Sequence, residues 1–261
     1  MDVEWIKRML RDTPFHRLYR RTAAWRTATP SPSLEDVNFT YDRQTVEVMH
    51  RVLRKDSICV DVGAHTGEIL RHLVAIAGAG THHAFEALPH FAEDLRERFP
   101  SVQVHQIAVS DSRGEAEFQH VENDPSYSGL RRRLYDRPDP RIVAIRVPVG
   151  TLDEEIPVDQ PVAFIKMDIE GGEYHALKGA IKTIQRGQPV IVFEAGSRST
   201  GQYGVTAADL YDLVTSTIGY DVSTMARYLA GEAPMTKQQF LHNWDHGPDF
   251  YFIATPAMSR A

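Results

Sequence analysis

The chain has 261 residues, of which 42% are hydrophobic, so it is long enough to bury the core of one mid-sized domain. Its formal net charge of −6 argues against a general affinity for nucleic acid. One cysteine, Cys59, excludes a disulfide framework and favours a reducing compartment. We find no apolar run that could cross a bilayer and no signal-peptide core. These features predict a soluble, cytoplasmic protein without a transmembrane segment or a nucleic-acid partner.

A basic segment with its own composition opens the sequence. Bulky apolar residues are mixed with arginine and lysine as far as about Thr27, and Pro14 interrupts the pattern, which predicts one or two amphipathic helices. A linker rich in proline and serine then ends at Ser33. We therefore divide the chain into a helical segment with its linker, residues 1–33, and one α/β domain, residues 34–261. The segment is suited to capping the domain, to a homodimer contact, or to a membrane surface or acidic substrate.

Strand and helix signals alternate along the rest of the chain. After a helix over Asp42–Leu53, we expect a first apolar strand that includes Cys59–Val62. The other predicted strands are 82–86, 102–105, 115–120, 163–168, 188–194, 220–223 and 249–254, and the other predicted helices are 68–77, 174–184 and one that starts at Thr206. Unbroken apolar strands between helices indicate a mostly parallel sheet that is covered on both faces.

The turn after the first strand, Asp61–Gly67, reads DVGAHTG and resembles a cofactor cradle. Its glycines can adopt positive φ and allow close approach of a ligand, and the following helix offers free N–H groups. A nucleotide, a dinucleotide and S-adenosylmethionine would all suit such a turn. Glu86, at the end of the second strand, can accept hydrogen bonds from ribose hydroxyls. Because Asp61 would repel a pyrophosphate, the pattern favours S-adenosylmethionine. The alternative is an ordinary strand-to-helix turn of an α/β protein that binds no cofactor.

Two motifs resemble the FkbM-type family of S-adenosylmethionine-dependent methyltransferases. They are DVGAHTG and the more specific IKMDIEGGEYHALKGA at Ile165–Ala180, and weaker agreement extends over Ser57–Ala195. The resemblance implies a Rossmann-like class I methyltransferase fold with a seven-stranded, mostly parallel sheet. It also implies methyl transfer to an oxygen nucleophile. The nearest analogy is to family members that methylate bacterial saccharides, polysaccharides or glycolipids, which predicts a small-molecule or oligosaccharide acceptor.

The same resemblance implies a set of donor-binding residues around the first three strand ends. Ala108 and Asp111 are included because the end of the third strand usually meets the adenine. The predicted S-adenosylmethionine-binding residues are Asp61, Gly63, Ala64, His65, Gly67, Glu86, Ala108 and Asp111.

Acidic residues at two strand ends are candidates for metal binding or for contact with the donor and the acceptor. Asp168 closes the fourth predicted core strand and Glu194 the fifth, so both should face the crevice over the carboxyl ends of the sheet. Since close carboxylates repel one another, we hypothesise a Mg²⁺ site built from Asp168, Glu194 and Asp245. In the metal-free alternative, Asp168 holds the amino group of the donor and Glu194 binds substrate hydroxyls.

A general base is the remaining requirement. Histidine has a suitable unperturbed pKa, so His242 and His246 join Glu170, Asp168 and Glu194 as the predicted catalytic residues. A long polar segment, 127–138, is suited to a lid over the acceptor. An NAD-linked oxidoreductase and a non-catalytic nucleotide-binding protein on the same fold are the two alternative functions.

Overall fold

The computed structural model describes residues 34–135, 138–247 and 249–257, and for residues 34–37 the backbone only. The chain divides into two compact units, Met1–Thr40 and Tyr41–Ala261, and the second unit carries the features described below. The predicted basic helices and linker, 1–33, lie outside the described residues, so they and the boundary after residue 33 stay predictions. Among the described residues, no helix has both the length and the apolar character of a membrane span.

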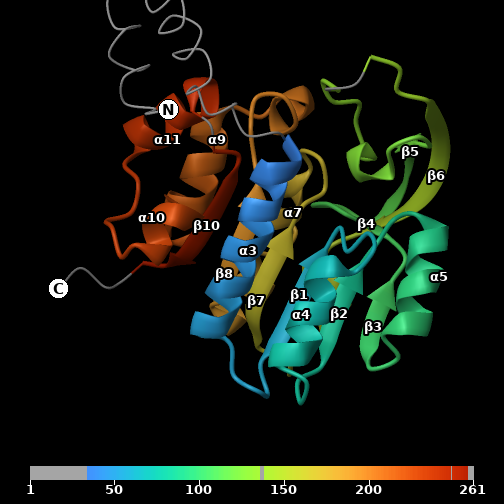
Figure 1. The fold of residues 1–261 in the computed structure, drawn as a ribbon, viewed down its shortest axis with the longest axis horizontal. Helices are drawn as coiled ribbons and strands as arrows, with labels where there is room; N and C mark the ends of the chain where they lie inside the picture. The colour runs from blue at the N-terminus through green and yellow to red at the C-terminus, as the bar shows by residue number, and fades with distance from the viewer. Residues whose placement is uncertain (1–33, 136–137, 248, 258–261) are drawn as a thin grey trace, which may run out of the picture. The chain divides into compact units, whose positions relative to one another are not determined.

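A seven-stranded sheet is the centre of the second unit (Figure 1). Its strand order is β3-β2-β1-β7-β8-β10-β9, and every pairing is parallel except the two that β10 makes. The strands are β1 (Ile58–Val62), β2 (His82–Phe85), β3 (Val102–His105), β7 (Val162–Met167), β8 (Val190–Glu194), β9 (Tyr220–Thr224) and β10 (Tyr251–Pro256). This arrangement confirms the predicted mostly parallel, Rossmann-like sheet of seven strands.

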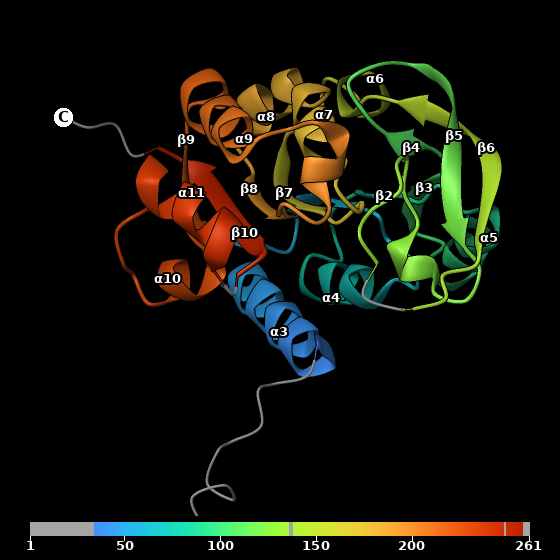
Figure 2. The same ribbon diagram turned by 90° about the horizontal axis from the view of Figure 1, so that it is seen from above.

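Helices cover both faces of this sheet (Figure 2). One face carries α4 (Glu68–Ile76), α5 (Pro89–Arg98) and the part of α3 (Leu34–Val52) from Tyr41 onward, and the other carries α7 (Glu173–Lys178), α8 (Ile181–Gly187) and α9 (Ala207–Asp212). The layers bury apolar strand residues such as Val60, Ile165 and Phe193. A capping box between Thr206 and Asp209 starts α9, as the sequence predicted.

A second sheet of three strands stands over the carboxyl ends of β2 and β3 (Figure 1). It consists of β4 (Ala108–Val109), β6 (Ile142–Gly150) and β5 (Gly114–Val121), in that order. Phe118 and Val147 pack against Leu88, which follows β2 directly. The sequence predicted β5 but not β6, whose apolar residues are interrupted by Arg146 and Pro148 and of which only the last part is buried.

The predicted helix over 174–184 is wrong as a single element, since α7 and α8 are separate helices. They part at Gly179, where the backbone passes so close to the carbonyl of Ser110 that a Cβ would overlap it. Contact with the neighbouring chain segment therefore overrides a helical sequence pattern. Among the described α-helices, α5 and three others were not predicted. The three others are α6 (Leu152–Glu155), α10 (Met225–Leu229) and α11 (Lys237–His246).

Two histidines on neighbouring strands form a buried chain of polar contacts. Nδ1 of His83 lies 3.1 Å from Nε2 of His105, and Nδ1 of His105 lies 3.1 Å from a carboxylate oxygen of Glu155. Nε2 of His83 is 2.7 Å from the side-chain oxygen of Gln160, and the His105 ring stacks on Phe85. Burial lowers the pKa of both histidines, so folding favours their neutral forms.

We predict that the stability contributed by His83 and His105 falls between about pH 7 and pH 5, while the buried carboxyls of Asp61 and Glu173, with pKa values raised to about 6 and about 7, contribute in the opposite direction. Because the folded-state pKa of His83 and of His105 lies below the unfolded value, the unfolded chain binds more protons in this range. Urea unfolding at both pH values measures the effect. On going from pH 7 to pH 5, His105→Asn should lose less stability, or gain more, than wild type, whereas replacing the exposed His50 by asparagine should leave the pH dependence as in wild type. Equal pH dependence in wild type and His105→Asn would contradict this account.

Candidate active site

The turn between β1 and α4 is held against the end of β2. Backbone N–H groups of Gly63 and Ala64 both donate to the carbonyl of Phe85, at 2.9 and 3.1 Å. Gly63 has φ +76°, and a Cβ there would overlap the carbonyl oxygen of Asp168. Gly67, with φ +77°, is the N-cap residue of α4. The positive φ of both glycines agrees with the sequence prediction, while the close approach at Gly63 is that of the Asp168 backbone and the binding of a ligand stays a prediction.

Glu86 follows β2 and is tied to the same turn. Its Oε2 accepts a hydrogen bond from the backbone N–H of His65 at 2.8 Å, and its Oε1 accepts one from Leu88 at 2.8 Å. Each carboxylate oxygen can accept a second hydrogen bond, so Glu86 remains able to bind ribose hydroxyls. The His65 ring lies 4.2 Å from that of Phe91, which gives this end of the cradle an aromatic wall.

Lys166 on β7 connects the first motif to the second. Its Nζ donates to the carbonyl of Gly63 at 3.1 Å and lies 3.6 Å from a carboxylate oxygen of Asp61 and from one of Asp168. Asp61 is fully buried, and burial raises the pKa of its carboxyl to about 6, although Lys166 opposes the shift. Burial by itself would lower the pKa of Lys166, but Asp168 and Asp61 raise it, so the ammonium stays charged.

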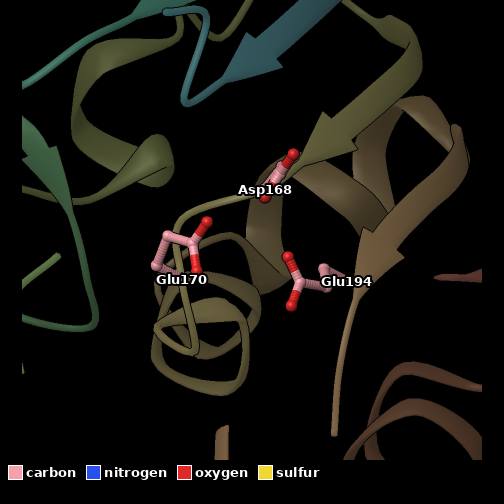
Figure 3. A group of neighbouring side chains, drawn as sticks. All are labelled: Asp168, Glu170 and Glu194. Atoms are coloured by element: carbon pink, nitrogen blue, oxygen red, sulfur yellow. The ribbon is translucent and has the colours of Figure 1, made fainter. Parts of the chain in front are cut away.

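Three carboxylates meet beyond this lysine, and we call Asp168, Glu170 and Glu194 the carboxylate group (Figure 3). They come from the end of β7, the loop that follows it, and the end of β8, and they point toward a common space. One oxygen of each lies within 4.8 Å of the others. The loop is strained, because Glu170 has φ +60°. The sequence correctly placed Asp168 and Glu194 at neighbouring strand ends.

Two other side chains contact the carboxylate group. The hydroxyl of Tyr251 on β10 donates to Oδ2 of Asp168 at 2.5 Å. Arg133, from the predicted lid, forms an ion pair with Glu170, and its Nη1 lies 3.9 Å from Oε1 of Glu194. Only 9% of the Arg133 side chain is exposed, and its guanidinium lies over the ring of Tyr127.

Negative charge is in excess at this centre. Burial and then Asp168 raise the pKa of Glu194 well above its ordinary value, against the opposing charge of Arg133. Burial likewise raises the pKa of the neighbouring Glu173 to about 7. Since desolvated carboxylates that lack enough counter-charge bind protons, the centre is suited to a ligand that brings positive charge.

Several predicted site residues lie elsewhere. His242, Asp245 and His246 are exposed on α11 and are not part of the carboxylate group, and the two histidine rings stack on each other. Asp245 is therefore not a ligand for an ion held by that group. Ala108 is buried in β4, and the Asp111 carboxylate pairs with Lys178 at 2.7 Å. These contacts do not join either residue to the Gly63 turn.

A cavity of about 720 Å³ lies between the second sheet and α7. Its lining is mostly polar and includes Asp111, Arg131, Arg132, His175 and Tyr203. Thus the three consecutive arginines of the predicted lid separate: two line this cavity, while Arg133 contacts the carboxylate group.

Sequence reasoning missed Lys166 and Tyr251 as site residues and grouped Arg133 with its neighbours. A lysine inside an apolar strand was the one available signal, because a buried charge needs a partner. Tyr251 lies in an ordinary strand pattern, and three adjacent arginines carry no information on which one turns inward.

The strand order, the antiparallel β10 and the glycine turn beside Glu86 define a Rossmann-like class I methyltransferase. The sequence matches the family described as Methyltransferase FkbM domain over residues 61–228. The chain belongs to this family of S-adenosylmethionine-dependent methyltransferases, which confirms the resemblance seen in its two motifs. The family assignment also decides against an NAD-linked oxidoreductase.

Solved structures with a similar fold share little sequence with this chain. The methyltransferase FkbM of Methylobacillus flagellatus KT is 19% identical with a TM-score of 0.48, and the match covers 80% of this chain and 50% of that one. An O-methyltransferase from Bacillus cereus in complex with SAH is 10% identical with a TM-score of 0.44, covering 97% and 96%. A TehB-like SAM-dependent methyltransferase from Corynebacterium glutamicum is 11% identical with a TM-score of 0.44, covering 94% and 100%. No curated protein sequence matches the chain.

We predict that Gly63→Ala abolishes binding of S-adenosylhomocysteine and lowers the free energy of unfolding by about 2 kcal/mol or more. The added methyl group would overlap the Asp168 carbonyl at a position with positive φ. Calorimetry and urea unfolding measure the two effects. Gly196→Ala is the matched control, because a Cβ there meets nothing within 4 Å. Normal binding by Gly63→Ala would show that the turn is not the donor cradle.

Proposed function

We propose that this protein is an O-methyltransferase that acts on a hydroxyl of a carbohydrate-containing acceptor, such as a bacterial saccharide, polysaccharide or glycolipid. The observation that carries the proposal is a buried carboxylate group beside the glycine turn, with Glu194 held at a raised pKa. Transfer to a hydroxyl requires a bound donor, an acceptor oxygen in line with the methyl group, and a group that takes the proton.

The chain's own residues account for donor binding. S-Adenosylmethionine supplies an electrophilic methyl group on a sulfonium that carries positive charge. Glu86 is positioned to accept hydrogen bonds from ribose hydroxyls, and the hydrogen bond from the His65 N–H holds the glycine turn beside it. The excess negative charge around Asp61 and Asp168 favours a cationic ligand over a pyrophosphate. Asp61, Gly63, Ala64, His65, Gly67 and Glu86 are the proposed donor-binding residues.

Glu194 is the proposed general base. A carboxylate with a raised pKa is a stronger proton acceptor than an ordinary one, and it can share the proton with Asp168 nearby. Asp168 is itself oriented by Tyr251 and Lys166. Glu170 completes the set and is the proposed hydroxyl-orienting acid. His242 and His246 are not proposed, since both lie exposed on α11.

A carbohydrate acceptor is supported by the cavity between the second sheet and α7. Tyr203 offers an aromatic ring on which a sugar can stack, and Arg131 and Arg132 offer planar donors for hydroxyl or anionic groups. The cavity between the second sheet and α7 has room for more than one sugar ring. An oligosaccharide is therefore a better fit than a single small alcohol.

The carboxylate group also fits a hard divalent cation in donor type and spacing. Its three oxygens lie within 4.8 Å of one another, and oxygen ligands of this kind suit Mg²⁺. Asp168, Glu170 and Glu194 would hold the ion, rather than the set with Asp245, and Glu194 would then be a metal ligand instead of the general base. Bound there, Mg²⁺ would lower the pKa of the acceptor hydroxyl and fix its orientation.

We predict that Glu194→Gln lowers kcat by about 10²–10⁴-fold with saccharide acceptors, while the Kd for S-adenosylhomocysteine stays within about twofold. The amide keeps the shape of the side chain but cannot accept the proton. In wild type, kcat/KM should fall as pH drops through a pKa above the ordinary carboxyl range, and the variant should lack this acid limb. Labelled methyl transfer measures both, with the exposed Glu93→Gln as control. Wild-type turnover by Glu194→Gln would refute the assignment.

We predict that dialysis against a chelator lowers methyl transfer at least about tenfold and that Mg²⁺ restores it. Glu170→Gln should need more Mg²⁺ for half-maximal activity, because it removes one charged ligand of the carboxylate group. Asp245→Asn is the matched control and should respond like wild type. Activity that persists unchanged after chelation would remove the metal from the proposal and leave the methyl transfer.

Ligand binding measured by calorimetry, together with a product assay, distinguishes a methyltransferase from a non-catalytic nucleotide-binding protein. We expect S-adenosylhomocysteine to bind more tightly than NAD or ATP, and a donor-dependent product to form with a saccharide. Tight donor binding without any product from a broad set of saccharides would favour a binding protein on the same fold.

A further inference from the structure

Arg133 is a buried cation that already occupies the carboxylate group. Its guanidinium pairs with Glu170 and lies 3.9 Å from an oxygen of Glu194, so it lies beside the oxygens that would hold a metal ion. It is the cationic side chain that pairs with these two acids among the residues the structure describes, since Lys166 pairs with Asp61 and Asp168 instead. The two cations thus serve different parts of the centre.

A guanidinium in this position and a divalent ion exclude each other. Mg²⁺ requires ligand oxygens at about 2.0–2.1 Å in a near-octahedral shell. Glu170 and Glu194 can turn toward such an ion only if their oxygens leave Arg133. Two positive charges a few ångströms apart in a buried centre would also repel strongly. Steric overlap and charge repulsion therefore both prevent Arg133 and a divalent ion from occupying the carboxylate group together.

The segment that carries Arg133 has no helix or strand between the bridge of Gln119 with Gly129 and the next gap in the described residues. It is held by the backbone hydrogen bond from Leu134 to the carbonyl of Arg198, by the hydrogen bond from Nε of Arg132 to Gln119, and by the contact of the Tyr135 ring with Tyr127. Nε of Arg133 is buried without a hydrogen-bond partner. When the arginine leaves the carboxylate group, it therefore gives up its ion pair with Glu170 and its position over the Tyr127 ring, but no hydrogen bond of Nε.

We propose that Arg133 and a divalent cation compete for Glu170 and Glu194, so that binding of the metal releases the arginine and its segment from the centre. This inference rests on the proposed metal site of the methyltransferase. It gives the centre two forms, one neutralised by Arg133 and one by the ion. Release of the arginine would open the space beside the carboxylate group to the acceptor hydroxyl.

Binding of Mn²⁺, used as a spectroscopic probe by electron paramagnetic resonance, tests the competition without any acceptor. Arg133→Gln should bind Mn²⁺ about tenfold more tightly than wild type or more, because the competing charge is gone. Arg133→Lys should bind nearly like wild type, since it keeps the charge. Arg131→Gln removes an exposed charge two residues away and is the matched control, expected to change the affinity by less than about twofold.

Free guanidinium ion provides a second readout that a general field effect would not produce. Added to Arg133→Ala at tens of millimolar, it should weaken Mn²⁺ binding toward the wild-type value, and sodium at equal ionic strength should not. Thermal unfolding checks that each variant is folded.

Unchanged or weaker Mn²⁺ binding by folded Arg133→Gln would overturn the proposal, and so would equal gains in Arg133→Gln and Arg131→Gln. If neither wild type nor Arg133→Gln binds Mn²⁺ while saccharides are still methylated, the competition and the metal fail but the O-methyltransferase stands. If Arg133→Gln gains affinity as expected but no hydroxyl is methylated, the proposed function fails and the competition stands.

Discussion

The rest of the centre depends on the interaction of the buried Lys166 ammonium with the carboxylates of Asp61 and Asp168. The ammonium donates to the Gly63 carbonyl and lies between Asp61 and Asp168, so it joins the donor turn to the carboxylate group. Removing one partner of a buried pair leaves an uncompensated charge, which is strongly destabilising. Without Lys166, the two aspartates would repel each other at the place where the two motifs must meet.

Two parts of the fold contribute different halves of the centre. The main sheet supplies the acids, because Asp168 and Glu194 end the adjacent parallel strands β7 and β8. The chain between β3 and β7 supplies Arg133 and the polar cavity beside the second sheet. The acids thus lie at the edge of a regular sheet, whereas Arg133 lies on irregular chain.

Much of the main sheet was predictable because its strands are buried on both faces. Continuous apolar runs identified β1, β7 and β8, and the parallel order then followed from the alternating helices. In β6 the apolar residues are interrupted by Arg146 and Pro148, and this strand was not predicted. The break between α7 and α8 could not be predicted either, since it depends on how closely Gly179 approaches Ser110. Local periodicity cannot report a contact with a distant segment.

The sequence by itself determined the donor turn and the two strand-end acids, because Gly63, Asp168 and Glu194 owe their positions to local pattern and strand order. Only the tertiary structure decided which further side chains join them. It brought in Lys166, Tyr251 and Arg133, and it left His242, Asp245 and His246 exposed on α11. The reason is physical: charge compensation in a buried centre depends on distances between segments far apart in the chain, and a motif does not encode those distances.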